Sequence, residues 1–177
     1  MIVLVMFMLF EYRRMLPEEK PFIESLCKEI KNPDIKSFPG YWTRFKNWEN
    51  NPPFVLLKDN IIVGFTAIIF PKTKLYANHY AFAVKIDMQR QGLGEKLWDI
   101  TIKESKKANK KFIRTGANSK YLGYTFFKEK LGWQPYFSKD NKFKFEADIT
   151  SINDYQEFKN NIKKFATKPI KQLSDYT

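Results

Sequence analysis

A strand that ends in a glycine turn is the part of this sequence with the clearest chemical use. The segment from Val84 to Gly94 reads Val-Lys-Ile-Asp-Met-Gln-Arg-Gln-Gly-Leu-Gly, and Glu95 follows at the start of an expected helix. Such a turn presents unpaired backbone N–H groups at a helix N-terminus, where their partial positive charge suits a pyrophosphate. Glycine is useful there because a side chain would hold the phosphate away. Taken alone, the turn is also compatible with a purely structural role.

Other nucleotide and metal motifs do not fit the sequence. A Walker A loop ends in Gly-Lys-Ser/Thr, whereas Gly94 is followed by Glu95, and a dinucleotide fingerprint needs a third glycine where Leu97 stands. Cys27 is the only cysteine and His79 the only histidine, which excludes a His/Cys zinc site and a disulfide within the chain. We therefore expect no metal and a reducing, cytoplasmic location.

Two segments together resemble a known family. The loop Gln89-Arg90-Gln91-Gly92-Leu93-Gly94 resembles motif A of the GNAT N-acetyltransferases, a Gln/Arg-x-x-Gly-x-Gly/Ala loop after the fourth strand. The later segment Phe126-Phe-Lys-Glu-Lys-Leu-Gly-Trp133 resembles the family's closing helix-to-strand segment, and the resemblance extends over about Phe54 to Tyr136. It implies an acyltransferase that moves an acetyl or related acyl group directly from coenzyme A to an amine.

The resemblance also implies which residues hold the co-substrate acetyl-CoA. The backbone amides of the glycine loop would bind its pyrophosphate, and the strand edge at Val84 and Ile86 would pair with the peptide-like pantetheine arm. Asn118 matches a family position that often touches the same arm. No enzyme nucleophile is required, because the thioester already carries a good leaving group and positioning lowers the barrier. The expected cofactor-binding residues are thus Val84, Ile86, Gln89, Arg90, Gln91, Gly92, Leu93, Gly94 and Asn118.

The expected general acid departs from the family pattern. A tyrosine often used to protonate the thiolate lies four residues before the closing Gly-Phe pair, and in this chain Lys128 holds that position before Gly132. Tyr124, one turn earlier on the same helical face, could replace it, or Lys128 could stabilise the thiolate by its charge. Tyr124 is also compatible with a half-buried structural role.

The general base has two side-chain candidates, His79 and Tyr80. His79 has an ordinary pKa of about 6.5 and is the natural first choice. Side chains alternate between faces along a strand, and family members that place a base here use the parity of Tyr80, Phe82 and Val84. This alternation predicts that His79 points to the face of the sheet opposite that of Tyr80. A water molecule that relays the proton of the acceptor amine is favoured over either side chain as the base.

The charge of the chain bears on its partners. Lys and Arg number 31 against 19 Asp and Glu, a formal net charge of +12. Lysine-rich stretches from Lys103 to Lys111 and from Lys159 to Lys171 would suit an anionic partner such as DNA or tRNA, although charge runs are usually solvated helix faces. An amine on nucleic acid or aminoacyl-tRNA is therefore favoured over a polyamine as acceptor. The alternative is a basic nucleic-acid-binding or modifying module with this fold that does not carry out ordinary acetyl transfer.

An aromatic segment from Phe38 to Trp48 is expected to shape the acceptor site, because the region after the first helix does so in the resembled family. Aromatic rings interleaved with cations could also hold an unstacked base, but the same spacing suits an ordinary apolar helix face. The substrate-binding candidates are Tyr41, Trp42, Arg44 and Phe45.

The elements that must position these residues follow from hydrophobic periodicity. We expect strands over about residues 2–13, 54–57, 61–70, 75–86, 111–117, 133–137 and 142–148, and helices over 17–32, 91–109, 119–131 and 151–167, with a further helical stretch that carries Tyr41, Trp42, Phe45 and Trp48 on one side. Ser151 is expected to cap the last helix. The run from Met1 to Phe10 is too short to span a bilayer, so no membrane partner is expected.

This order predicts an α/β (α+β) fold with a GNAT-like mixed, mostly antiparallel central sheet flanked by helices, ending in a C-terminal helix. With 177 residues, we expect one transferase domain over 1–150, with a C-terminal helix and tail over 151–177 packed on it or extending from it. The assembly is expected to be a monomer or a homodimer.

Overall fold

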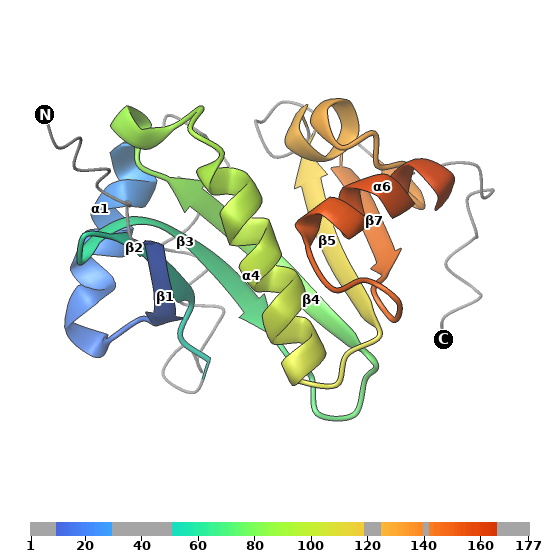
Figure 1. Ribbon diagram of the computed structural model, residues 1–177, viewed down its shortest axis with the longest axis horizontal. Coiled ribbons are helices and arrows are strands. Elements are labelled where there is room, and N and C mark those ends of the chain that lie inside the picture. The colour runs from blue at the N-terminus through green and yellow to red at the C-terminus, as the bar shows by residue number, and fades with distance from the viewer. Residues whose placement is uncertain (1–9, 30–50, 119–124, 140–141, 166–177) are drawn as a thin grey trace, which may run out of the picture.

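The computed structural model describes residues 10–29, 51–118, 125–139 and 142–165, and it shows a seven-stranded sheet (Figure 1). The strand order is β1-β2-β3-β4-β5-β7-β6. All neighbouring strands are antiparallel except β4 and β5, which are parallel. The expected mixed, mostly antiparallel sheet flanked by helices is therefore confirmed. The strands are β1 Phe10–Arg14, β2 Phe54–Lys58, β3 Ile61–Ile69, β4 Tyr76–Val84, β5 Phe112–Asn118, β6 Phe137–Lys139 and β7 Lys142–Asp148.

Helices cover both faces of the sheet. They are α1 (Lys20–Glu29), α4 (Leu93–Lys107) and α6 (Tyr155–Phe165), with short 3-10 turns η1 (Pro17–Glu19) and η2 (Ile86–Met88) and a π-helical turn η3 (Thr125–Lys130). The larger hydrophobic core joins α4 and α6 to one face, and Trp98 lies at its centre with 1% of its surface exposed. A second cluster joins α1 to the other face. Among the described residues, no helix is long and apolar enough to cross a membrane.

The β2–β3 hairpin confirms the sequence prediction. Asp59 and Asn60 form its turn with φ angles of 50° and 64°, a left-handed conformation that these two residue types tolerate. The turn places a run of buried side chains from both strands in the middle of the sheet.

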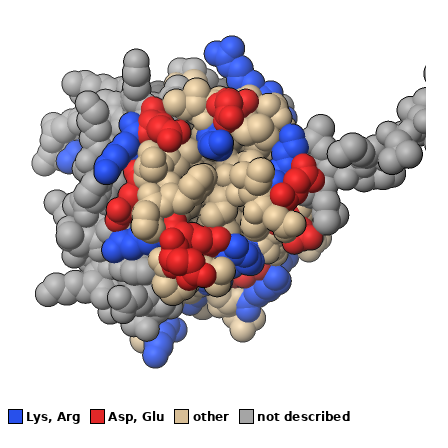
Figure 2. Space-filling model, turned by 90° about the vertical axis from the view of Figure 1, so that its left-hand side faces the viewer, with Lys and Arg blue, Asp and Glu red and all other residues tan. Residues whose placement is uncertain are grey.

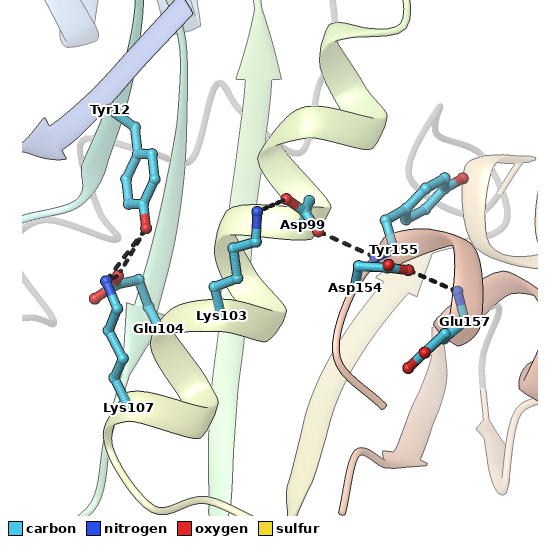
Figure 3. A network of polar contacts seen from close by, with 8 residues as sticks. All are labelled: Tyr12, Asp99, Lys103, Glu104, Lys107, Asp154, Tyr155 and Glu157. Carbon is cyan, nitrogen blue, oxygen red and sulfur yellow. Dashed lines mark hydrogen bonds and ion pairs between the residues drawn. The ribbon is translucent and has the colours of Figure 1, made fainter. Parts of the chain in front are cut away.

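The C-terminal helix begins later than predicted, and its cap is Asp154 rather than Ser151 (Figure 3). The Glu157 N–H donates to Asp154 Oδ1 at 2.8 Å. The Tyr155 N–H donates to Oδ1 of Asp99 on α4 at 3.0 Å, and Asp99 also forms an ion pair with Lys103. The start of α6 is therefore fixed by a local cap, Asp154, together with a carboxylate from a distant helix, Asp99, and only the second contact is beyond the reach of a local sequence pattern.

We expect Asp99→Ala to lower the free energy of unfolding by about 1–2 kcal/mol, because it removes the acceptor of a helix-start N–H. Lys103→Met removes only the exposed ion pair and should change the free energy of unfolding by less than about 1 kcal/mol. Urea unfolding of both variants measures the difference. Equal losses in the two variants would show that Asp99 acts through the ion pair and not through α6.

The segment before β6 differs from the prediction in two ways. Of the helix expected over 119–131, the described part is a π-helical turn, in which the Leu131 N–H donates to Phe126 O at 3.1 Å. Trp133 was expected in a strand but precedes β6, because Gly132 takes a φ of 67° and ends the turn. The Trp133 indole is buried, and its N–H donates to the Glu146 carbonyl.

Candidate active site

The parallel strands β4 and β5 diverge along their length (Figure 1). Their backbones pair at Tyr76 with Phe112, Ala77 with Ile113 and Asn78 with Arg114, and the pairing stops there. Beyond this point β4 pairs only with β3, and β5 only with β7. Beyond Asn78 and Arg114 the facing edges of the two strands therefore do not pair with each other, and an extended, peptide-like chain could hydrogen bond to backbone groups along them.

The glycine loop lies at the wide end of this divergence. Arg90 and Gly92 both have left-handed backbones, with φ angles of 61° and 78°, and α4 starts at Leu93. The backbone N–H groups of Glu95 and Lys96 donate hydrogen bonds to the Gly92 carbonyl oxygen. In the described part of the chain, no acceptor pairs with the backbone N–H groups of residues 90–94.

These free amides fit an anionic group. A Cβ atom added at Gly92 would meet no atom within 4 Å, so the space beside this residue of the loop is open. The N-terminus of a helix of 15 residues adds its dipole to the same point. Gln89 has a different role, because its side-chain Nε2 donates to Val84 O at 3.1 Å and thereby ties the loop to the end of β4.

The position of His79 corrects the alternation argument. Ala67 pairs with Ala81 and Ile68 with His79, so β4 carries a bulge at Tyr80. The extra residue places His79 on the same face as Phe82, and their ring centroids lie 5.6 Å apart. Simple alternation had predicted opposite faces.

The surroundings of His79 do not favour a role as base. Its ring is 3% exposed, and burial lowers its pKa to about 3. Nδ1 is hydrogen bonded to Thr115 Oγ1 at 3.1 Å, and Nε2 has no partner among the described residues. The imidazole is thus neutral near pH 7, and it lies among the rings of Phe82, Trp98 and Phe127.

Tyr80 is the better placed of the two side-chain candidates. It occupies the bulge and is 40% exposed. Partial burial raises the pKa of its phenol, so the hydroxyl is neutral near pH 7 and suited to donate a hydrogen bond or to orient a water molecule.

The remaining predicted residues are placed only in part. The Lys128 ammonium donates to Gln134 Oε1, which holds it within its own segment. Asn118 is the last residue of β5, at the wide end of the divergence. Ile86 is exposed in η2, just beyond the end of β4. Tyr124 and the acceptor-site candidates Tyr41, Trp42, Arg44 and Phe45 lie outside the described residues.

Two phenylalanines next to the loop were not among the predicted site residues. The rings of Phe82 on β4 and Phe126 on η3 lie 5.1 Å apart, and a Cβ at Gly94 would sit 3.7 and 3.9 Å from them. An ion pair of 2.9 Å between Lys130 and Glu95 joins η3 to the start of α4 on the same side. The sequence offered one signal for Phe126, because this residue begins the second segment that resembles the family, Phe126 to Trp133.

The lysine-rich stretch at the end of α4 is largely used in internal contacts. Lys103 pairs with Asp99 and Lys107 with Glu104, both at 2.6 Å. Lys106 and Lys110 donate to backbone carbonyls of neighbouring loops. On the left-hand side of the molecule in Figure 1, which faces the viewer in Figure 2, acidic and basic side chains are likewise mixed around an uncharged centre. These contacts favour a structural role for the stretch over a continuous phosphate-binding surface.

Comparison with known proteins agrees with this geometry. Residues 36–145 match a family model described as an acetyltransferase (GNAT) domain. The fold is similar to that of the PaiA N-acetyltransferase of Thermoplasma acidophilum in complex with coenzyme A, with a TM-score of 0.61 at 16% identity, covering 80% of this chain and 99% of that one. It is also similar to the ribosomal-protein-S18-alanine N-acetyltransferase of Escherichia coli, with a TM-score of 0.59 at 17% identity, covering 80% and 94%. No curated protein sequence matches the chain.

Proposed function

This chain belongs to the GNAT acetyltransferase family, and we propose that it transfers an acetyl group from acetyl-CoA directly to an amine. The observation that carries the proposal is the continuity between two features. The unpaired amides of residues 90–94 lie at the wide end of two strand edges that do not pair with each other beyond Asn78 and Arg114. One feature suits a pyrophosphate, and the other suits the amide-containing arm attached to it.

The residues of the loop and of β4 would hold the co-substrate. When bound, acetyl-CoA supplies an activated thioester. The amides of residues 90–94 would bind its pyrophosphate, while the edge of β4 that faces β5 would orient its arm. Gln89 would act as a positioning residue, because its side chain fixes the loop against Val84.

Proton transfer in this proposal does not use His79. An ammonium acceptor must lose a proton before it attacks, and a buried imidazole with a pKa of about 3 is a poor base near neutral pH. Water oriented by the exposed Tyr80 hydroxyl would accept that proton instead. Tyr124 or Lys128 would stabilise the departing thiolate, by hydrogen bond or by charge.

The acceptor class follows from charge. A net charge of +12 attracts anionic partners, so we propose an amine carried on nucleic acid or aminoacyl-tRNA. A protein α-amine is the second candidate, since the Escherichia coli structural relative is named for acetylation of a ribosomal-protein alanine.

We expect wild-type protein to bind acetyl-CoA in calorimetric titration and Gly92→Glu to bind at least about tenfold more weakly. The new carboxylate would lie within the loop and repel the pyrophosphate, and the left-handed backbone of residue 92, with a φ of 78°, would also be strained by any side chain. Thr73→Glu adds the same charge in an exposed loop and should leave affinity unchanged. If wild-type protein that has been freed of bound ligand does not bind acetyl-CoA, the proposed function is overturned. If both variants weaken binding equally, the placement of the pyrophosphate at the loop is overturned.

A further inference from the structure

The narrow end of the diverging strands is closed by a pair of side chains. Asn78 and Arg114 form the last backbone pair of β4 and β5, and the next residues along each strand are His79 and Thr115. Their side chains are hydrogen bonded to each other at 3.1 Å, and both residues are buried, with 3% and 7% exposed. The strands thus separate at a point that a side-chain hydrogen bond bridges.

The space behind this pair is filled by large rings. The His79 ring centroid lies 4.7 Å from that of Trp98, 5.6 Å from that of Phe82 and 6.2 Å from that of Phe127. Trp98 also contacts Phe127, Trp133 and Phe158 in the main core. Because protein interiors are close-packed, the pair has little freedom to retreat from a larger ligand.

The proposed co-substrate would bring its acyl group to this point. Because Tyr80 is the extra residue of the bulge, the segment of β4 from Val84 at the loop to His79 spans four regular steps, or about 13 Å at roughly 3.3 Å per residue. That distance is comparable to an extended pantetheine arm, so a pyrophosphate held at residues 90–94 places the thioester next to His79 and Thr115.

We propose that His79 and Thr115 limit the length of the acyl group, so that the site accepts acetyl and rejects longer straight chains. The inference rests on the proposed function. His79 is then a specificity-determining residue that Thr115 holds in place. Its neutral ring closes the end of the acyl-binding site and blocks longer acyl chains. In a tight apolar pocket one additional methylene changes recognition by about tenfold or more.

Titration of wild-type protein with free CoA, acetyl-CoA and butyryl-CoA tests this proposal without an acceptor. We expect free CoA and acetyl-CoA to bind with similar affinity and butyryl-CoA at least about tenfold more weakly. The His79→Ala variant, which removes this ring, should bring butyryl-CoA to within about threefold of acetyl-CoA.

Two Thr115 variants separate size from hydrogen bonding. Thr115→Val keeps the volume and loses the hydroxyl, so it should keep the preference for acetyl-CoA. Thr115→Ala removes volume and should improve binding of propionyl-CoA, which keeps the test decisive if thermal melting shows that His79→Ala is unfolded. Equal binding of acetyl-CoA and butyryl-CoA by wild-type protein would overturn the acyl limit while leaving the proposed function intact. Failure to bind even free CoA would instead overturn the proposed function.

Discussion

Lowering the pH from 7 to 4 should destabilise the fold by up to about 3 kcal/mol through His79 alone. Burial lowers the pKa of this imidazole to about 3, against about 6.5 in the unfolded chain. The unfolded state therefore binds a proton between these two values while the folded state does not. The stabilising contribution is fully present above about pH 6.5 and is lost as the pH falls towards 3.

Urea unfolding at several pH values between 4 and 7 measures this effect. Other groups also titrate, because Arg13 holds the pKa of the Glu19 carboxyl below its ordinary value, and that contribution is likewise lost in acid. His79→Phe keeps a ring of similar shape but cannot be protonated, so the difference between variant and wild-type slopes isolates the imidazole. Identical slopes would show that His79 is solvated or already charged in the folded protein.

Gly64→Ala should lower the free energy of unfolding by about 2–4 kcal/mol, because the added methyl group has no room. A Cβ at Gly64 would lie 2.7 Å from the Ala83 carbonyl oxygen and 3.2 Å from Cδ1 of Leu97. The first of these is backbone of the neighbouring strand and cannot rotate away. The end of β4 or the start of α4 would have to shift.

Gly94→Ala is the matched control for that substitution. Its Cβ would make only ordinary contacts, at 3.7 and 3.9 Å, with the Phe82 and Phe126 rings, and alanine favours the first turn of a helix. We expect a change of less than about 1 kcal/mol by the same unfolding measurement. Comparable losses in both variants would contradict the close approach of β3 to β4 and α4.

Function and local structure were predictable where the signal is local. The turn at Asp59 and Asn60, the periodicity of α1 and α4, and the glycine loop after β4 all depend on residues close together in the chain. The family-like loop and the closing segment allowed the acetyltransferase assignment for the same reason.

The face of a side chain was not predictable where a distant partner decides it. Alternation predicted that His79 would lie opposite Phe82, but the bulge at Tyr80 reverses this. A bulge is set by how β4 pairs with β3, and strand pairing depends on packing across the sheet. Sequence alone could identify the histidine but not its enclosure.

The sequence by itself determined the class of protein: a mixed sheet with helices, a glycine loop between a strand and a helix, and a strongly basic chain. Only the tertiary structure decided how the charges and strand edges are used. It joins Lys106 and Lys110 to backbone carbonyls of distant segments, and beyond Asn78 it leaves β4 and β5 without pairing to each other. The physical reason is that periodicity and turn chemistry act over a few residues, whereas strand divergence, a bulge and the enclosure of a side chain arise from contacts between segments far apart in the chain.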